Sequence, residues 1–122
     1  MDPISTALIS ALAALTEPVV KDAYNGVKML IHRKFGADSG LTTAVESLEQ
    51  RPESKGRREV LVEEVAAAKA QQDSELLDAA ESLIEKIESQ PEGKQIVYNV
   101  AQQITGHRNI VSGTGDININ EK

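Results

Sequence analysis

Aliphatic residues recur at three- and four-residue intervals along most of the chain, and this spacing restricts the fold more than any other feature. Such intervals place apolar side chains on one face of an α-helix. The 122 residues include no Trp, one Phe and two Tyr, so any core must be aliphatic and rich in alanine. These features predict one all-α domain, a helical bundle of four to five helices. The cleanest helical face contains Leu76, Leu77, Ala80, Leu83, Ile84 and Ile87.

Local start and stop signals divide this pattern into separate helices. Asp2 followed by Pro3 suits the beginning of a first helix over residues 3–15. A second helix is expected to begin at Pro18 and to end before Gly36. A third, short helix follows over residues 41–48. Residues 53–89 form either one long helix or two helices, the second capped by Asp73 or Ser74.

The first helix has no charged residue between positions 3 and 16. The side chains around its aliphatic face are only Ser, Thr and Ala, and a helix that lacks charge all round lies either in a core or in a membrane. It is too short to span a bilayer alone, which takes about 20 residues. Two expectations stay open: a core helix that never leaves the bundle, or a segment that inserts into membranes. The membrane-insertion candidates are Ile4, Leu8, Ile9, Leu12 and Leu15.

The last part of the chain contains a seven-residue repeat, at residues 104–110 and 111–117. Each unit reads β-branched aliphatic, hydroxyl residue, Gly, two free positions, Asn or Asp, and Ile. The β-branched residues favour strands, and Gly with Asn or Asp favours a tight bend, so each unit predicts strand, corner, strand. The tail has little charge, no proline and a run of Asn and Gln residues, and such units can stack on copies of themselves. The motif residues are Gln103, Ile104, Gly106, Asn109, Ile110, Val111, Gly113, Asp116, Ile117 and Ile119.

The clearest boundary in the chain is Gln90-Pro91-Glu92-Gly93. We therefore expect a helical domain over residues 1–90, a linker over residues 91–94 and a β-forming or disordered tail over residues 95–122. The apolar residues of segment 94–103 fit both the period of a helix and the period of a strand. They offer a helical spacing of aliphatic residues and also a strand-like alternation, and the expectation leans to extended or conditionally ordered structure.

Charge and reactive residues exclude several function classes. Residues 37–93 carry six Lys or Arg against fourteen Asp or Glu, and an acidic surface does not favour nucleic acid as a partner. There is no Cys, and His32 and His107 lack the neighbours of a nucleophile or a metal site. The segment 113–115 lacks the Lys of a phosphate loop. We expect no catalytic residues, no metal and no cofactor, and therefore no enzyme.

The tail resembles the amyloid signalling motifs related to the RIP homotypic interaction motif, on Gln103, Gly106, Asn109 and the β-branched residues between them. That motif usually reads aliphatic, Gln, aliphatic, Gly, two free positions, Asn. Here one extra residue separates Gln103 from Gly106, and Thr105 replaces an aliphatic residue, so the resemblance indicates the motif class only. It implies a tail that forms fibrils with itself and with the matching motif of an NLR-type receptor.

The order of parts resembles bacterial Bell domains and the fungal HeLo and HeLo-like domains, which are cell-death effectors. The resemblance implies a bacterial effector that is cytoplasmic when resting and lies at the cell membrane when activated. Amyloid templating would activate it, and its first helix would then attack inner-membrane lipid. Lys28, Arg33 and Lys34 offer contact with anionic lipid, although charge at the end of the second helix explains them more simply.

Two other function classes fit the same sequence. The first is a non-toxic helical adaptor or scaffold that clusters with partners through the C-terminal motif. The second is a regulator whose tail folds only on its target. The adaptor requires the first helix to stay in the bundle, whereas the effector requires it to leave.

Overall fold

The computed structural model describes residues 2–112, with side chains as far as Ile104, and this part of the chain contains six α-helices and no strand. The prediction of an all-α bundle is confirmed, with one α-helix more than the expected four to five. A short 3-10 helix, Ala70–Gln72, lies between the fourth and fifth α-helices. The α-helices are α1 (Pro3–Leu12), α2 (Pro18–Phe35), α3 (Gly40–Gln50), α4 (Lys55–Ala67), α5 (Ser74–Glu88) and α6 (Gly93–Ser112).

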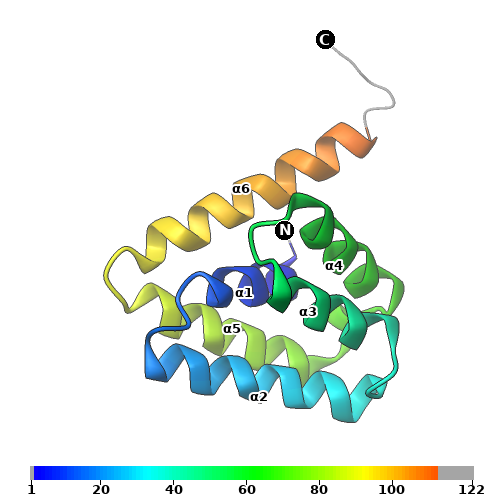
Figure 1. Ribbon diagram of the computed structural model, residues 1–122, viewed down its shortest axis with the longest axis horizontal. Helices are drawn as coiled ribbons and strands as arrows, with labels where there is room; N and C mark the ends of the chain where they lie inside the picture. The colour runs from blue at the N-terminus through cyan, green and yellow to red at the C-terminus, as the bar shows by residue number, and fades with distance from the viewer. Residues whose placement is uncertain (1, 113–122) are drawn as a thin grey trace.

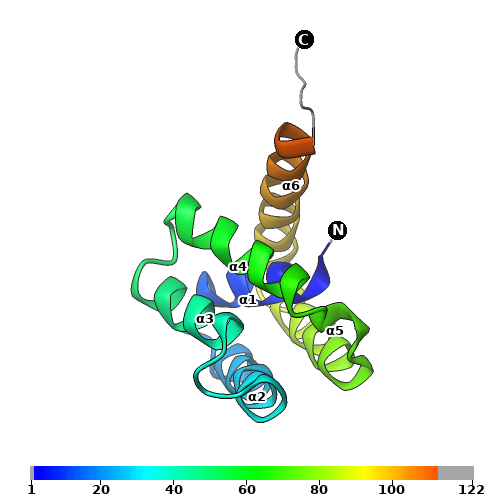
Figure 2. The ribbon, with the colours of Figure 1, turned by 90° about the vertical axis from the view of Figure 1, so that its right-hand side faces the viewer.

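Helix α1 lies in the middle of the bundle (Figures 1 and 2). It packs against α2, α4, α5 and α6, and α2 and α5 also pack against each other. Helix α3 packs against α2 and α4. Helix α6 lies on α1 and α5, and its C-terminal end extends beyond the other helices in both views (Figures 1 and 2). The first segment of the chain is therefore enclosed by segments from its whole length.

Capping residues set several helix boundaries, and those at Gly36 and Asp73 agree with the sequence prediction. The side chain of Ser39 accepts the backbone N–H of Thr42 at the start of α3. Helix α2 ends at Gly36, whose φ of 97° lies in the left-handed region that favours glycine. Asp73 accepts the N–H of Leu76 at 2.9 Å and begins α5. Residues 53–89 therefore form two helices, and the alternative of one long helix is wrong.

The expected extended structure of residues 94–103 is wrong, because these residues are helical and belong to α6. Val97, Val100 and Ile104 are buried in the common core, at a spacing that only a helix places on one face. Tyr98, which would alternate with its neighbours in a strand, is 59% exposed. The predicted tail therefore begins inside a helix whose residues Val97, Val100 and Ile104 pack in the core of the helical domain. This segment is helical because its apolar residues are buried against the other helices, although its β-branched residues favour a strand.

Candidate functional site: the buried first helix and its cover

Helix α1 is buried on every side rather than along one stripe. The proposed insertion residues Ile4, Leu8 and Ile9 are at most 2% exposed, and Leu12 and Leu15 are partly buried against the same core. The opposite side of the helix is buried too, with Ala7 and Ala11 fully enclosed. The sequence pattern of a helix without charge on any face is therefore explained, in this fold, by its central position.

The polar residues of α1 are buried as well. Asp2 caps the helix by accepting the backbone N–H groups of Ile4 at 3.0 Å and Ser5 at 3.1 Å, and it also accepts the Ser5 hydroxyl. The hydroxyls of Thr6 and Ser10, one helical turn apart, have no hydrogen-bond partner within the described residues. A buried polar group without a partner costs about 1–3 kcal/mol. Among the described residues, van der Waals packing therefore holds this side of α1 without hydrogen bonds from the Thr6 and Ser10 side chains.

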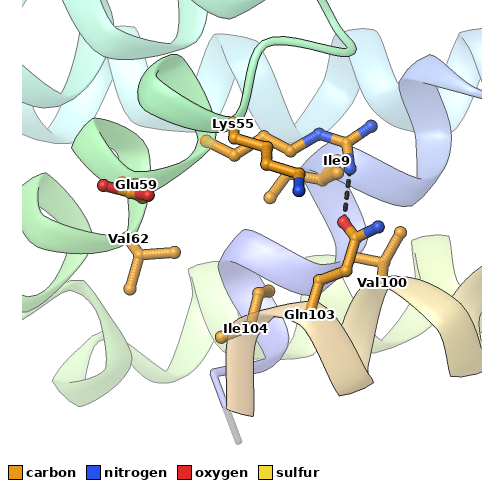
Figure 3. A pocket seen from close by; sticks show the side chains of 8 residues that line it. Ile9, Lys55, Glu59, Val62, Val100, Gln103 and Ile104 are labelled. Atoms are coloured by element: carbon orange, nitrogen blue, oxygen red, sulfur yellow. Dashed lines mark hydrogen bonds between the residues drawn. The ribbon is translucent and has the colours of Figure 1, made fainter. Parts of the chain in front are cut away.

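Helix α6 covers α1 with its buried face. Val100 and Ile104 of α6 lie beside Ile9 of α1 around a cavity that also reaches α4 (Figure 3). One hydrogen bond joins the two helices beside this cavity: Nη1 of Arg58, on α4, donates to Oε1 of Gln103, on α6, at 2.5 Å (Figure 3). Arg58 is not among the residues that the sequence points to, because its partner lies 45 positions away and no local pattern links them.

The motif residues divide into three groups in the structure. Gln103 and Ile104 are part of the folded bundle, as described above. Gly106, Asn109, Ile110 and Val111 lie in the backbone helix of α6, beyond the last described side chain. Gly113, Asp116, Ile117 and Ile119 lie outside the described residues. The expected strands of the repeat remain a prediction about the assembled tail.

Acidic residues on α3 and α5 pair with the basic end of α2. Lys28 Nζ lies 2.9 Å from Oε2 of Glu49. Lys34 Nζ lies 2.9 Å from Oε1 of Glu75 and 3.2 Å from Oδ2 of Asp73. These pairs satisfy the positive charges within the protein, which favours the helix-end explanation of the basic cluster over contact with lipid.

Hydrogen bonds in this cluster shift the pKa values of three side chains. Hydrogen bonds to Glu75 and Asp73 raise the pKa of Lys34. The backbone N–H of Leu76, with Lys34 as a further partner, lowers the pKa of Asp73. The hydrogen bond from Lys34 lowers the pKa of Glu75. All three groups are thus charged across the neutral range, and together they join the end of α2 to the start of α5.

The described residues offer no cluster of three or more His, Cys, Asp or Glu suited to a metal ion. His32 has one acidic neighbour, Glu46, with 3.7 Å between His32 Nε2 and Glu46 Oε2. Within residues 2–112, no helix combines the length and the apolar character needed to cross a bilayer.

Fold and site together define a class: a small helical bundle that encloses an uncharged helix under a C-terminal cover. The chain matches the family model of the Het-E N-terminal domain, HetE-N, over residues 1–122. It therefore belongs to this family, a fungal family of HeLo-like cell-death domains. The membership confirms the predicted HeLo-like relation. No curated protein and no solved structure matches the chain.

Proposed function

We propose that this chain is a cell-death effector whose first helix stays inside the bundle until the C-terminal motif assembles. The observation that carries the proposal is an overlap between motif and cover. Gln103 and Ile104 belong to the predicted amyloid motif, and the same two residues close the bundle over α1. A residue cannot occupy a helix against Ile9 and a cross-β stack at the same time. Assembly of the motif would therefore remove part of the cover.

The free energy that Ile104 and Gln103 contribute is large enough, relative to the stability of the domain, for their withdrawal to act as a trigger. Burial of one isoleucine side chain contributes roughly 1.5–3 kcal/mol, and an intramolecular hydrogen bond contributes about 1 kcal/mol. A domain of this size has a total stability of about 5–15 kcal/mol. Withdrawal of Ile104 and Gln103 would thus remove a substantial share of the stability, and it would act first on the groove above α1.

Helix α1 has properties that suit release. Its side chains carry no charge, so transfer from the core to a membrane interface costs little. Release would also free the Thr6 and Ser10 hydroxyls from a site where they have no partner. The ten residues of α1 extend about 15 Å at 1.5 Å per residue, half of a hydrocarbon core of roughly 30 Å. A lesion would therefore require several helices, which clustering along a fibril would supply.

The proposal includes the remaining expectations from the sequence. The chain acts without catalysis, polymerises with itself, and receives its signal from an NLR-type receptor with a matching motif. It rests in the cytoplasm and acts on membrane lipid after activation. The order of parts resembles bacterial Bell domains as well as fungal HeLo-like domains, and the mechanism is the same for either branch.

The deep burial of most of α1 favours a second candidate, a non-toxic adaptor that clusters through its tail. In this function α1 is permanent core, and the fibril only gathers folded domains. The two candidates differ in one observable: whether α1 becomes accessible when the motif assembles.

Thiol labelling can measure this directly, because the chain contains no cysteine. Ala7→Cys on α1 and Ala80→Cys on α5 each introduce one small, fully buried thiol. Full-length chains would be seeded with fibrils of a peptide of residues 103–122, and labelling would be followed beside dye-loaded anionic vesicles. We expect seeding to accelerate labelling of the Ala7→Cys variant ahead of the Ala80→Cys variant, together with dye release.

Three other results would count against the effector. Equal acceleration at both positions would indicate global unfolding rather than release of α1. Fibrils that form while both thiols stay protected would favour the adaptor. A peptide that forms no fibrils at all would remove the trigger, and the alternative of a tail that folds on one partner would then be preferred.

A further inference from the structure

The groove between α4 and α6 is a candidate binding site in its own right. It encloses a cavity of about 350 Å³ whose floor is Ile9 of α1 (Figure 3). This volume lies at the lower end of the range of small-molecule sites, roughly 300–1,000 Å³. Side chains from α4 form one wall, and side chains from α6 form the other.

The floor and walls of the groove are aliphatic. Ile9, Val62, Val100 and Ile104 line it, and none of the described lining residues is aromatic. Such a surface suits a flexible hydrocarbon chain, because it provides apolar contact without the stacking faces that a planar ring requires. The lining therefore favours a ligand with an alkyl chain over a nucleotide or another aromatic compound.

Two cations, Lys55 and Arg58, lie at one end of the groove, and neither has a carboxylate partner among the described side chains. Within residues 2–104, whose side chains the structure describes, Lys55 forms neither a side-chain hydrogen bond nor an ion pair. Arg58 donates to two neutral oxygens, the carbonyl of Pro52 at 2.8 Å and Oε1 of Gln103 at 2.5 Å. By contrast, Lys34 on α2 has two carboxylate partners.

The remaining lining residue, Glu59, lies beside Val62, away from the Arg58–Gln103 hydrogen bond (Figure 3). One end of the groove is therefore cationic, and the other end combines apolar side chains with a carboxylate. A ligand with a negative head and an apolar chain matches this polarity, whereas a ligand with a cationic head does not.

We infer that the groove binds a single-chain fatty carboxylate. The carboxylate accepts hydrogen bonds from Lys55 Nζ and the Arg58 guanidinium, both of which carry full positive charge. The chain lies along Val62, Val100 and Ile104 over Ile9. One alkyl chain fits the volume, whereas a two-chain phospholipid is too large for it.

The bound ligand joins α4 to α6 across α1. A ligand that binds only the folded arrangement stabilises it in proportion to the logarithm of ligand concentration over Kd. A fatty carboxylate would therefore oppose withdrawal of α6. This regulatory consequence rests on the proposed function, whereas binding itself does not.

Titration of the full-length protein with decanoate, followed by NMR of the Val and Ile methyl groups, tests the inference. We expect saturable shifts centred on Val62, Val100 and Ile104, and a rise in Tm with decanoate concentration. Decyltrimethylammonium, with the same chain and the opposite charge, should bind at least roughly fivefold more weakly. Acetate, with the same head and almost no chain, should not bind measurably.

Variants separate the site from general surface effects. Lys55→Gln should weaken decanoate binding roughly fivefold, the size expected for one partly exposed charge contact. Lys21→Gln, an exposed lysine on α2, should leave the affinity unchanged. Val62→Phe fills the groove from a partly buried position and should abolish binding while the fold is kept.

Several results would overturn the inference. These are the absence of saturable shifts, equal binding of both surfactants, or equal loss in the Lys21→Gln and Lys55→Gln variants. They would leave the proposed function intact, since thiol labelling at position 7 needs no ligand. Conversely, decanoate binding without release of α1 on seeding would support the site and reject the effector.

Discussion

At the scale of single residues, the clearest long-range contact joins Tyr24, Lys28 and Glu49. The Tyr24 hydroxyl donates to Oε2 of Glu49 at 2.5 Å, and Lys28 Nζ lies 2.9 Å from the same carboxylate. Burial and the neighbouring carboxylate raise the pKa of Tyr24, so its hydroxyl remains a donor throughout the usual pH range. This cluster fastens α3 to α2.

Removal of the Tyr24 hydroxyl tests this contact. Tyr24→Phe should lower the free energy of unfolding by about 1–2 kcal/mol, because Glu49 loses a hydrogen bond while the ring stays buried. Chemical denaturation measures the change. Tyr98→Phe is the control, since Tyr98 is largely exposed and its hydroxyl forms no hydrogen bond in the described residues. Equal effects of the two substitutions would show that the Tyr24–Glu49 contact contributes nothing.

The sequence predicts local residue roles better than distant pairs. The sequence predicts caps at Asp2 and at Asp73, and both residues cap helices, because a cap requires only a short polar side chain next to the start of a helix. The Tyr24–Glu49 contact spans 25 positions, and the Arg58–Gln103 contact spans 45. These pairs depend on how helices pack, which no short sequence pattern specifies.

At the scale of elements, the turn between α5 and α6 depends on Gly93. A Cβ atom at this position would lie 1.7 Å from the carbonyl oxygen of Ile87, which is backbone and cannot move alone. Gly93→Ala should therefore lower the free energy of unfolding by about 1–3 kcal/mol. The matched control is Gly26→Ala in α2, where a Cβ meets nothing within 4 Å.

The control has an expected result of the opposite sign. Alanine is favoured over glycine inside a helix, so Gly26→Ala should raise the free energy of unfolding by roughly 0.5–1 kcal/mol. Thermal or chemical denaturation of the two variants gives both values. Destabilisation by Gly26→Ala, or tolerance of Gly93→Ala, would contradict the packing described for these helices.

The junction of α2 and α5 should make stability depend on pH. Asp73 and Glu75 have lowered pKa values, so the unfolded chain binds more protons at these groups than the folded chain does. Their contribution is present above the ordinary carboxyl pKa of about 4 and is lost as pH falls through the lowered values. Lys34, with a raised pKa, contributes below its ordinary value and loses this contribution as pH rises through the raised one.

Asp73→Asn tests how much Asp73 contributes to the loss of stability at acid pH. The amide oxygen can still cap α5, but the charge beside Lys34 is gone, so stability should fall less steeply below about pH 4 than in the unmodified protein. Denaturation midpoints over a pH series provide the measurement. Asp78→Asn, at an exposed carboxylate of the same helix, should leave the steepness unchanged. If both variants show the same dependence of the denaturation midpoint on pH, Asp73 does not contribute to the loss of stability at acid pH.

Helix boundaries could be predicted wherever the signal is local. Helix α2 begins at Pro18 and ends before Gly36, as its sequence indicates. The extended structure expected for residues 94–103 is wrong, because their β-branched residues fit a strand as well as a helix. The deciding factor is the surface that α1 and α5 present to Val97, Val100 and Ile104, and this surface exists only in the folded bundle.

At the scale of the whole molecule, the sequence leaves α1 undecided between core and membrane because its composition suits both. An uncharged helix of Ile, Leu, Ala, Ser and Thr is stable wherever water is excluded. The rest of the chain provides such a place by wrapping α1 with four other helices. Among these, α6 is the one that carries residues of the predicted motif, so in the proposed function it is the element through which a signal reaches α1.

If α6 is a separable cover, weakening it should expose α1 before the rest of the bundle. Ile104→Ala removes buried side-chain volume at the edge of the groove and should lower the free energy of unfolding by about 2 kcal/mol. Amide hydrogen exchange should then accelerate in α1 and α6 while α2 and α3 keep their protection, since local opening follows the weakest packing. Met29→Ala, at a side chain that is 72% exposed, should change neither stability nor exchange. Uniform acceleration through all helices would mean that α6 leaves only when the whole domain unfolds, and the overlap of motif and cover could then not act as a trigger.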